Sequence, residues 1–116
     1  MHVRSIGAGL VLLAASLLLT ACPSRQTIAK INADPGRYHD KEVAIAGTVT
    51  NSYGFLDKGV YEVDDGTGRM WVATTRGVPA KGTRVGVKGL VYPTLNVGIK
   101  SFGVGMEETD RRTASR

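Results

Sequence analysis

Cysteine and histidine are almost absent from this chain. One cysteine, Cys22, and two histidines occur among 116 residues, so no disulfide bond can form within the chain. His39 is the only histidine after Cys22, and no spacing of residues suggests a metal site or a nucleophile beside a general base. We therefore expect no metal, no cofactor and no enzymatic activity.

Aromatic residues are few, and neither charge is in strong excess. Aromatic side chains make up 6% of the sequence, and 15 Lys and Arg stand against 10 Asp and Glu, a net charge of +5. This bias is weaker than the dense basic stripe of a dedicated nucleic-acid-binding protein. With 42% hydrophobic and 22% charged residues, the composition predicts one folded domain rather than a disordered chain.

The main apolar run lies at the N-terminus. A basic start that ends at Arg4 precedes small and apolar residues 5–19, a run shorter than the roughly 20 residues of a membrane-spanning helix. The run ends in Leu-Thr-Ala-Cys at residues 19–22, which resembles the lipobox of bacterial lipoproteins. The resemblance implies cleavage before Cys22 and attachment of a diacylglycerol and a further acyl chain, such as palmitate. A secretory signal with a chance cysteine and an uncleaved anchor helix are the alternatives.

These features predict a lipoprotein signal peptide over residues 1–21 and a lipidated cysteine with a short tether over residues 22–26. The tether extends about 13 Å, so the domain would lie close to the bilayer. Residue 23 is Pro rather than Asp, which favours the outer membrane by analogy with lipoprotein sorting. We expect the protein in the cell envelope, on the periplasmic face of the outer membrane if the host is Gram-negative.

The mature chain predicts one short helix and then strands. Thr27 is an acceptable N-cap for a helix over residues 27–34, which places Ile28 and Ile31 on one face. Alternating apolar residues predict five strands, over residues 42–50, 60–64, 69–75, 83–92 and 96–106. We expect a loop over residues 51–59, a hairpin turn over 65–68, a loop over 76–82, a bulge near Ser101, and a polar, disordered tail over 107–116.

Three segments carry a family resemblance, namely residues 43–49, 61–72 and 82–89. Their glycines, alternating valines and Asp-Gly-Thr-Gly turn resemble an OB-fold, most of all the small bacterial OB-fold lipoproteins and the tRNA-anticodon-binding-like OB group. The resemblance covers about residues 28–105 and implies an all-β, five-stranded barrel over residues 27–106. The segment 76–82 is too short for the usual helix, so a loop or the N-terminal helix would close that end. A meander sandwich is the rival architecture.

The OB-fold resemblance also implies where a ligand would bind. The binding surface of this fold lies on its second and third strands and the neighbouring loops, and aromatic and basic side chains there can stack on rings and contact phosphates. The candidate residues are Tyr53, Phe55, Arg69, Trp71, Lys88 and Tyr92. In the alternative interpretation, Trp71 lies under the helix 27–34, and Tyr53 and Phe55 close the barrel end.

The sequence therefore predicts a lipid-anchored envelope adaptor that binds a protein or glycan near the membrane. Single-stranded nucleic acid is an alternative partner, favoured by Trp71 beside Arg69 but disfavoured by the expected location. A purely structural lipoprotein is a second alternative.

Overall fold

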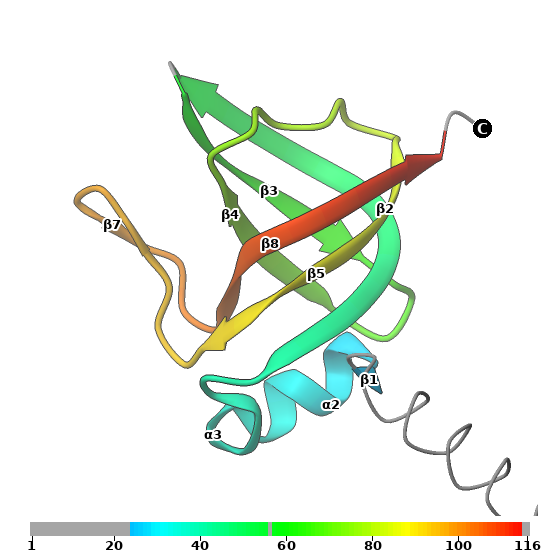
Figure 1. The fold of residues 1–116 in the computed structure, drawn as a ribbon, viewed down its shortest axis with the longest axis vertical. Coiled ribbons are helices and arrows are strands. Elements are labelled where there is room, and N and C mark those ends of the chain that lie inside the picture. The colour runs from blue at the N-terminus through cyan, green and yellow to red at the C-terminus, as the bar shows by residue number, and fades with distance from the viewer. Residues whose placement is uncertain (1–23, 56, 115–116) are drawn as a thin grey trace, which may run out of the picture.

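The computed structural model describes residues 24–55 and 57–114, which form a β-barrel with two short helices (Figure 1). The predicted signal peptide and Cys22 lie outside the described residues. Neither described helix is long and apolar enough to cross a membrane.

Five strands close the barrel. They are β2 (Glu42–Phe55), β3 (Lys58–Asp64), β4 (Arg69–Thr74), β5 (Arg84–Tyr92) and β8 (Gly105–Ala114). Their order is β2-β3-β4-β8-β5, and β5 pairs back onto β2. The β4–β8 pair is parallel, and the other pairs are antiparallel. This arrangement confirms the five-stranded barrel that the OB-fold resemblance implies.

Strand β2 belongs to both sides of the barrel. Its first half pairs with β5 and its second half with β3, with a register shift between Val49 and Asn51. Gly47 lies where the chain turns between these partners, and a Cβ there would overlap the carbonyl oxygen of Asp64. Gly89 in β5 is equally confined by Glu107 and Met106. Both glycines therefore stand where neighbouring strands of the barrel come too close for a larger side chain.

The interior is built from alternating residues of the strands, as predicted. Met70 and Val72 of β4 point inward, and Tyr61 and Val63 of β3 are fully buried beside them. The remaining members of the core are Ile28, Ile31, Val43, Ile45, Val49, Val85, Val87, Val91 and Met106. Every core residue of the described part of the chain lies between Ile28 and Met106, so residues 23–116 contain the core that the structure describes.

Helix α2 (Ile28–Ala33) closes one end of the barrel, below the strands in Figure 1. The Thr27 hydroxyl accepts the N–H of Lys30 at 3.3 Å, which is the predicted N-cap. The turn between β3 and β4 provides a second cap, since the Asp65 carboxylate accepts the N–H of Ile28 at 2.9 Å. A second short helix, α3 (Pro35–Tyr38), follows. The predicted helix is confirmed, but it closes the barrel end opposite residues 76–82 and not the end beside them (Figure 1).

The predicted loop over residues 51–59 is wrong. Strand β2 continues to Phe55, and β3 begins at Lys58. Asn51, Ser52 and Tyr53 are polar or aromatic and lack the inward apolar alternation of residues 43–49. Their pairing with β3 depends on backbone hydrogen bonds, which the side-chain pattern does not reveal.

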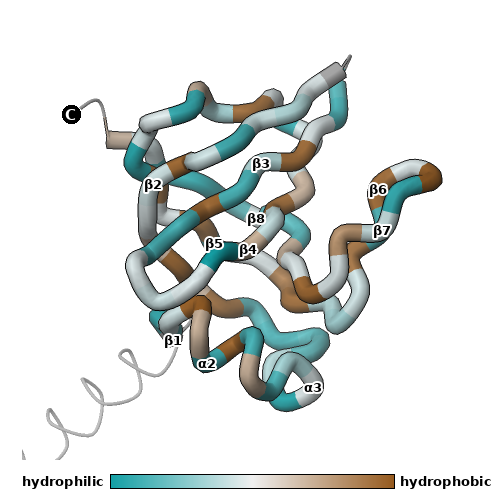
Figure 2. Tube along the Cα trace, turned by 180° about the vertical axis from the view of Figure 1, so that it is seen from behind, coloured by the Kyte–Doolittle hydropathy of each residue, from teal (hydrophilic) through white to brown (hydrophobic). Residues whose placement is uncertain are grey.

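The predicted last strand, over residues 96–106, is also wrong. Residues Asn96–Val97 (β6) and Lys100–Ser101 (β7) form a small hairpin that projects from the barrel (Figure 2). Gly98 and Gly103 take positive φ, a conformation that interrupts a strand. The fifth barrel strand is β8, in the segment predicted to be a frayed polar tail, and it pairs with β5 along its whole length.

The predicted tether is partly a strand. Ser24–Arg25 (β1) pairs in parallel with Val43 and Ala44 of β2, and the N–H of Gln26 donates to the carbonyl oxygen of Ala44 at 2.9 Å. The described structure therefore begins two residues after Cys22.

Candidate binding groove

Three aromatic rings gather on the outer surface of the barrel. The Trp71 ring lies between Tyr53 and Phe102, with centroid distances of 5.8 Å to Tyr53 and 5.1 Å to Phe102. The Tyr53 and Trp71 rings are inclined by 30°, a stacked arrangement, and Phe102 is tilted by 46°. Because these rings come from β2, β4 and the segment after β7, the surface brings together distant parts of the chain.

The strand pattern explains why Trp71 points outward. Met70 and Val72 fill the barrel, so the residue between them must face the other way. Tyr53 pairs with Val60 of β3, and Val60 pairs with Ala73 of β4. Val60 is buried and lies among the residues that line the same surface as Tyr53 and Trp71. Trp71 is therefore a surface residue packed against other rings and not a residue under helix α2.

The hairpin β6–β7 forms the other wall of a groove of about 530 Å³. Val97, Lys100 and Ser101 line the groove opposite Tyr53 and Trp71. Tyr53 is 60% exposed, and Ile99 at the hairpin tip is fully exposed. We call this site the aromatic groove; it lies over β3 and β4, between the β2–β3 connection and the β5–β8 connection, where OB-folds bind ligands.

Charges beside the aromatic groove are largely balanced. The Arg69 guanidinium lies 3.3 Å from the Asp64 carboxylate and 4.0 Å from that of Glu62. Glu62 also accepts hydrogen bonds from Thr50 at 2.8 Å and from Asn51 at 2.9 Å. The ammonium of Lys100 lies 5.5 Å from the centre of the Phe102 ring, a cation–π contact. The groove thus offers aromatic surface with one cation that no carboxylate of the described residues pairs with.

The structure brings together three of the six predicted ligand-binding residues. Tyr53 and Trp71 line the aromatic groove, and Arg69 follows on the same face of β4. Lys88 and Tyr92 lie on β5, which pairs with β2 and β8 and not with β3 or β4. Tyr92 and Trp71 both pair with Gly105 of β8, but neither Lys88 nor Tyr92 lines the aromatic groove. The side chain of Phe55 lies outside the described residues.

Phe102 and Lys100 are the groove residues that sequence reasoning missed. The sequence predicts a barrel strand over residues 96–106 and does not include Phe102 in the candidate site, whereas its ring lies 5.1 Å from that of Trp71. Gly98 and Gly103 lie on either side of residues 99–102. These two glycines were the sequence signal for the hairpin, because glycines within a strand pattern favour a turn over a continuous strand.

A buried polar cluster closes the barrel end opposite helix α2. The Glu108 side chain is 2% exposed and accepts hydrogen bonds from the Tyr61 hydroxyl at 2.5 Å and Thr74 at 2.9 Å. Arg111 donates to Glu108 at 3.2 Å and to the carbonyl oxygen of Gly77 at 3.0 Å. Burial, followed by the hydrogen bond to Glu108, raises the pKa of Tyr61 far above its usual value. Tyr61 therefore stays a neutral hydrogen-bond donor.

Metal ligands do not gather anywhere in the part of the chain that the structure describes. The Asp-Gly-Thr-Gly turn has a structural role, because its Asp65 holds the turn and helix α2 in place. Asp65 accepts the N–H groups of Thr67 and Gly68 as well as that of Ile28. Partial burial works to raise the pKa of the Asp65 carboxyl, but the hydrogen bonds from Thr67, Ile28 and Gly68 outweigh it and lower the pKa.

Comparisons with known proteins establish the fold. No protein-family model and no curated protein matches the chain. An OBody bound to hen egg-white lysozyme matches with a TM-score of 0.54 and 22% identity, over 71% of this chain and 90% of the OBody. A putative aspartyl-tRNA synthetase from Leishmania major Friedlin matches with a TM-score of 0.59 and 15% identity, over 77% of this chain and 20% of the synthetase. This chain is an OB-fold. At these identities the likeness extends to the fold alone.

Proposed function

We propose that this OB-fold protein is a lipid-anchored, non-enzymatic binding module of the cell envelope, which holds a glycan or protein partner in its aromatic groove. One observation carries the proposal. Tyr53, Trp71 and Phe102 form an aromatic groove at the surface where OB-folds bind their ligands. These rings are partly open to solvent rather than sealed in a core.

The lipobox supports the anchor. With β1 beginning at Ser24, lipidation of Cys22 would hold the barrel against the bilayer. Pro23 favours the outer membrane, on its periplasmic face, in a host with two membranes. The same anchor would place the aromatic groove within the periplasm, where glycans and envelope proteins are the available partners.

The charge balance of the groove favours a neutral ligand that stacks on rings. Arg69 is paired with Asp64 and Glu62, so it has little free charge to offer a phosphate. Single-stranded nucleic acid remains the second candidate, because it also stacks on exposed rings. Its affinity would fall steeply with salt through counterion release, whereas stacking of a neutral sugar would not.

Fluorescence of Trp71 tests the ligand class. Trp71 is the only tryptophan, so its emission in residues 23–116 reports on the aromatic groove. We would titrate soluble peptidoglycan fragments, a neutral chito-oligosaccharide and a mixed-sequence oligonucleotide of about 12 nucleotides, each at about 50 and 200 mM salt. We expect a salt-insensitive response to a glycan; a saturable, salt-sensitive response to the oligonucleotide alone would select the second candidate.

Matched variants identify the groove as the site. Tyr53→Ala removes a groove ring but keeps Trp71, and Tyr92→Ala removes a tyrosine on β5 that does not line the groove. We expect Tyr53→Ala to weaken binding about tenfold or more, the cost of one lost stacking partner, and Tyr92→Ala to leave it unchanged. Equal effects of both variants would contradict the groove.

Crosslinking in cells tests the protein partner. A photo-crosslinking amino acid at position 53 would capture whatever lies against the aromatic groove, and the same amino acid at position 92 is the control. We expect one adduct at position 53, absent at position 92, whose sensitivity to muramidase distinguishes glycan from protein. The intact mass of the mature protein checks the lipid on Cys22. Tolerance of every groove substitution, with no adduct, would favour a purely structural lipoprotein.

A further inference from the structure

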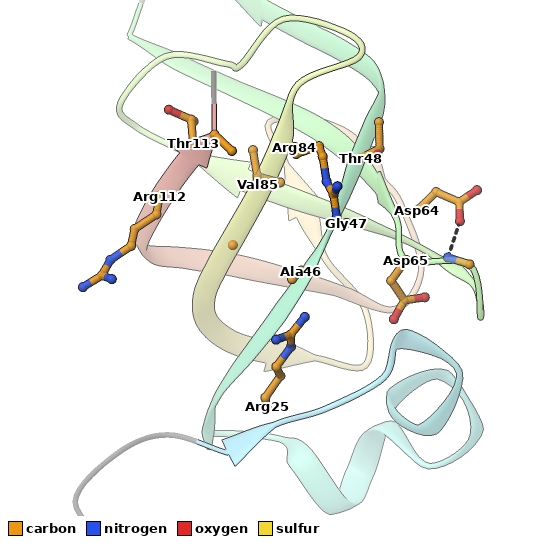
Figure 3. Close-up of a pocket in the computed structure, with 13 residues that line it drawn as sticks. Arg25, Ala46, Gly47, Thr48, Asp64, Asp65, Arg84, Val85, Arg112 and Thr113 are labelled. Atoms are coloured by element: carbon orange, nitrogen blue, oxygen red, sulfur yellow. Dashed lines mark hydrogen bonds between the residues drawn. The ribbon is translucent and has the colours of Figure 1, made fainter. Parts of the chain in front are cut away.

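A second surface lies on the side of the barrel formed by β2, β5 and β8. It holds a hollow of about 680 Å³ lined by Arg25, Arg84 and Arg112 (Figure 3). The floor is made of small residues, among them Ala46 and Gly86. Arg25 and Arg84 point over this floor from opposite ends, and Arg112 of β8 lies across β5 from them and extends outward (Figure 3). We call this surface the arginine face.

The three arginines differ from the others of the barrel in their partners. Arg69, Arg76 and Arg111 each pair with a carboxylate. Within residues 24–55 and 57–114, no carboxylate lies within ion-pair distance of the guanidinium groups that line the arginine face. All three are exposed, so their charges are available to an external anion.

The acidic residues beside the arginine face are already bound. Asp64 pairs with Arg69 and accepts the N–H of Gly66, and Asp65 caps helix α2. Asp110 pairs with Arg76 at 3.3 Å, and Lys88 adds a further positive charge beside Arg112. The face therefore presents a net positive charge over a floor without bulky side chains.

The arginine face lies beside the first described residues of the chain. Arg25 belongs to β1 and is the third residue after Cys22. Two residues span about 7 Å from Cys22 to Ser24, and the polar layer of one leaflet is about 5–8 Å thick. If Cys22 carries lipid, β1 and the arginines next to it must lie at the level of the headgroups.

We propose that the arginine face is a docking surface for anionic phospholipid headgroups, which seats the barrel on the bilayer and turns the aromatic groove away from it. The proposal rests on the lipid anchor of the proposed function. Guanidinium groups bind phosphate oxygens in a bidentate manner, and the small floor residues allow a phosphate to approach the barrel. In Figure 1, β1 and the β6–β7 hairpin lie on opposite sides of the barrel, so docking through one side leaves the other open.

Vesicle binding of a chemically acylated chain tests the docking. Cys22 is the only cysteine, so a maleimide with one myristoyl-length chain can be attached to it in residues 22–116. One such chain gives only marginal membrane binding, which makes the contribution of the arginines measurable. Vesicles of phosphatidylethanolamine with phosphatidylglycerol provide anionic headgroups, and vesicles of phosphatidylcholine are the neutral comparison.

We expect each of the variants Arg25→Gln, Arg84→Gln and Arg112→Gln to lower partition onto anionic vesicles about fivefold, and the triple variant about a hundredfold. Partition onto neutral vesicles should not change. Lys58→Gln removes one positive charge at the distant β2–β3 connection and should change partition less than twofold. Circular dichroism confirms that each variant folds.

Three outcomes would overturn the proposal. Equal losses for Lys58→Gln and for each arginine variant would show a diffuse charge effect without a docking face. Saturable binding of inorganic phosphate that Arg84→Gln abolishes, without an effect on vesicles, would assign the hollow to a soluble anion. Binding of an oligonucleotide that depends on the same arginines, again without an effect on vesicles, would assign it to nucleic acid. Because acylation is chemical, failure here is separate from absence of lipid on Cys22 in cells.

Discussion

The two sides of the barrel use similar residues in opposite ways. On the side of β3 and β4, Arg69 is held by two carboxylates, and aromatic rings provide the accessible surface. On the side of β2, β5 and β8, arginines are exposed and unpaired within the described residues, and the surface between them is made of small side chains. The first side suits a neutral ligand with rings, and the second suits a layer of phosphates.

Neighbouring arginines of β8 show the same contrast within one strand. Arg111 points inward, is 15% exposed and lies over the Tyr61 ring at 5.5 Å. Arg112 points outward and is exposed. Because successive residues of a strand face opposite sides, Arg111 packs in the barrel interior and Arg112 lies on the outer surface.

The largest expected effect follows from this pair. Arg111→Gln leaves Glu108 charged and buried without its cation, so we expect the free energy of unfolding to fall by about 3–5 kcal/mol. Arg112→Gln should change it by less than about 0.5 kcal/mol. Urea unfolding of residues 23–116, followed by circular dichroism, measures both. Similar losses for the two variants would show that Arg112 also has a structural role.

A second pair of variants compares Gly47 and Gly86, two of the glycines that line the arginine face. Gly47→Ala would push a methyl group into the backbone of Asp64, so we expect a loss of about 1–3 kcal/mol. A Cβ at Gly86 meets no atom within 4 Å. Gly86→Ala should therefore be neutral or stabilise the strand by up to about 1 kcal/mol. Thermal unfolding of both variants checks this order, and a destabilised Gly86→Ala would mean that the floor is packed more tightly than the structure has it.

The comparison also shows which features the sequence could predict. The barrel interior follows the period of two in β2, β4 and β5, and the helix cap and hairpin turn follow from Thr27 and from Asp65 with Gly66. Trp71 faces outward because Met70 and Val72 face inward. These are local rules, and each needs only a few neighbouring residues.

The features that sequence reasoning missed depend on partners far along the chain. Strand β8 has polar residues where an apolar alternation would be expected, because Glu108 and Arg111 fill the barrel end with a hydrogen-bonded cluster to Tyr61 and Thr74. Phe102 reaches Trp71 only because the chain forms the β6–β7 hairpin. The arginine face joins residues of β1, β5 and β8, which no spacing in the sequence connects.

Substitution of Asp65 should have the smallest effect on the free energy of unfolding, and it tests how helix α2 and the arginine face are connected. Its carboxylate caps helix α2 and also lies at the edge of the arginine face. Asp65→Asn replaces one of the two acceptor oxygens by an NH2 group, so it should cost about 0.5–1.5 kcal/mol of stability through hydrogen bonds lost to helix α2 or to the turn. The same change removes a negative charge beside Arg25 and Arg84, so partition onto anionic vesicles should rise by up to about fivefold. Opposite changes in stability and membrane affinity are the expected signature.

The lowered pKa of Asp65 adds a pH dependence to this test. Because the folded protein holds the carboxyl below its unfolded pKa of about 3.9, the charged cap stabilises the fold fully above that pH. The contribution is lost as pH falls through the lower, folded pKa. The difference in free energy of unfolding between the unaltered protein and Asp65→Asn should therefore become smaller as pH is lowered from about 6 to about 3. Urea unfolding of both proteins at each pH measures this difference. A gap that stays constant with pH would show that the hydrogen bonds of the turn, and not the charge of Asp65, hold helix α2 on the barrel.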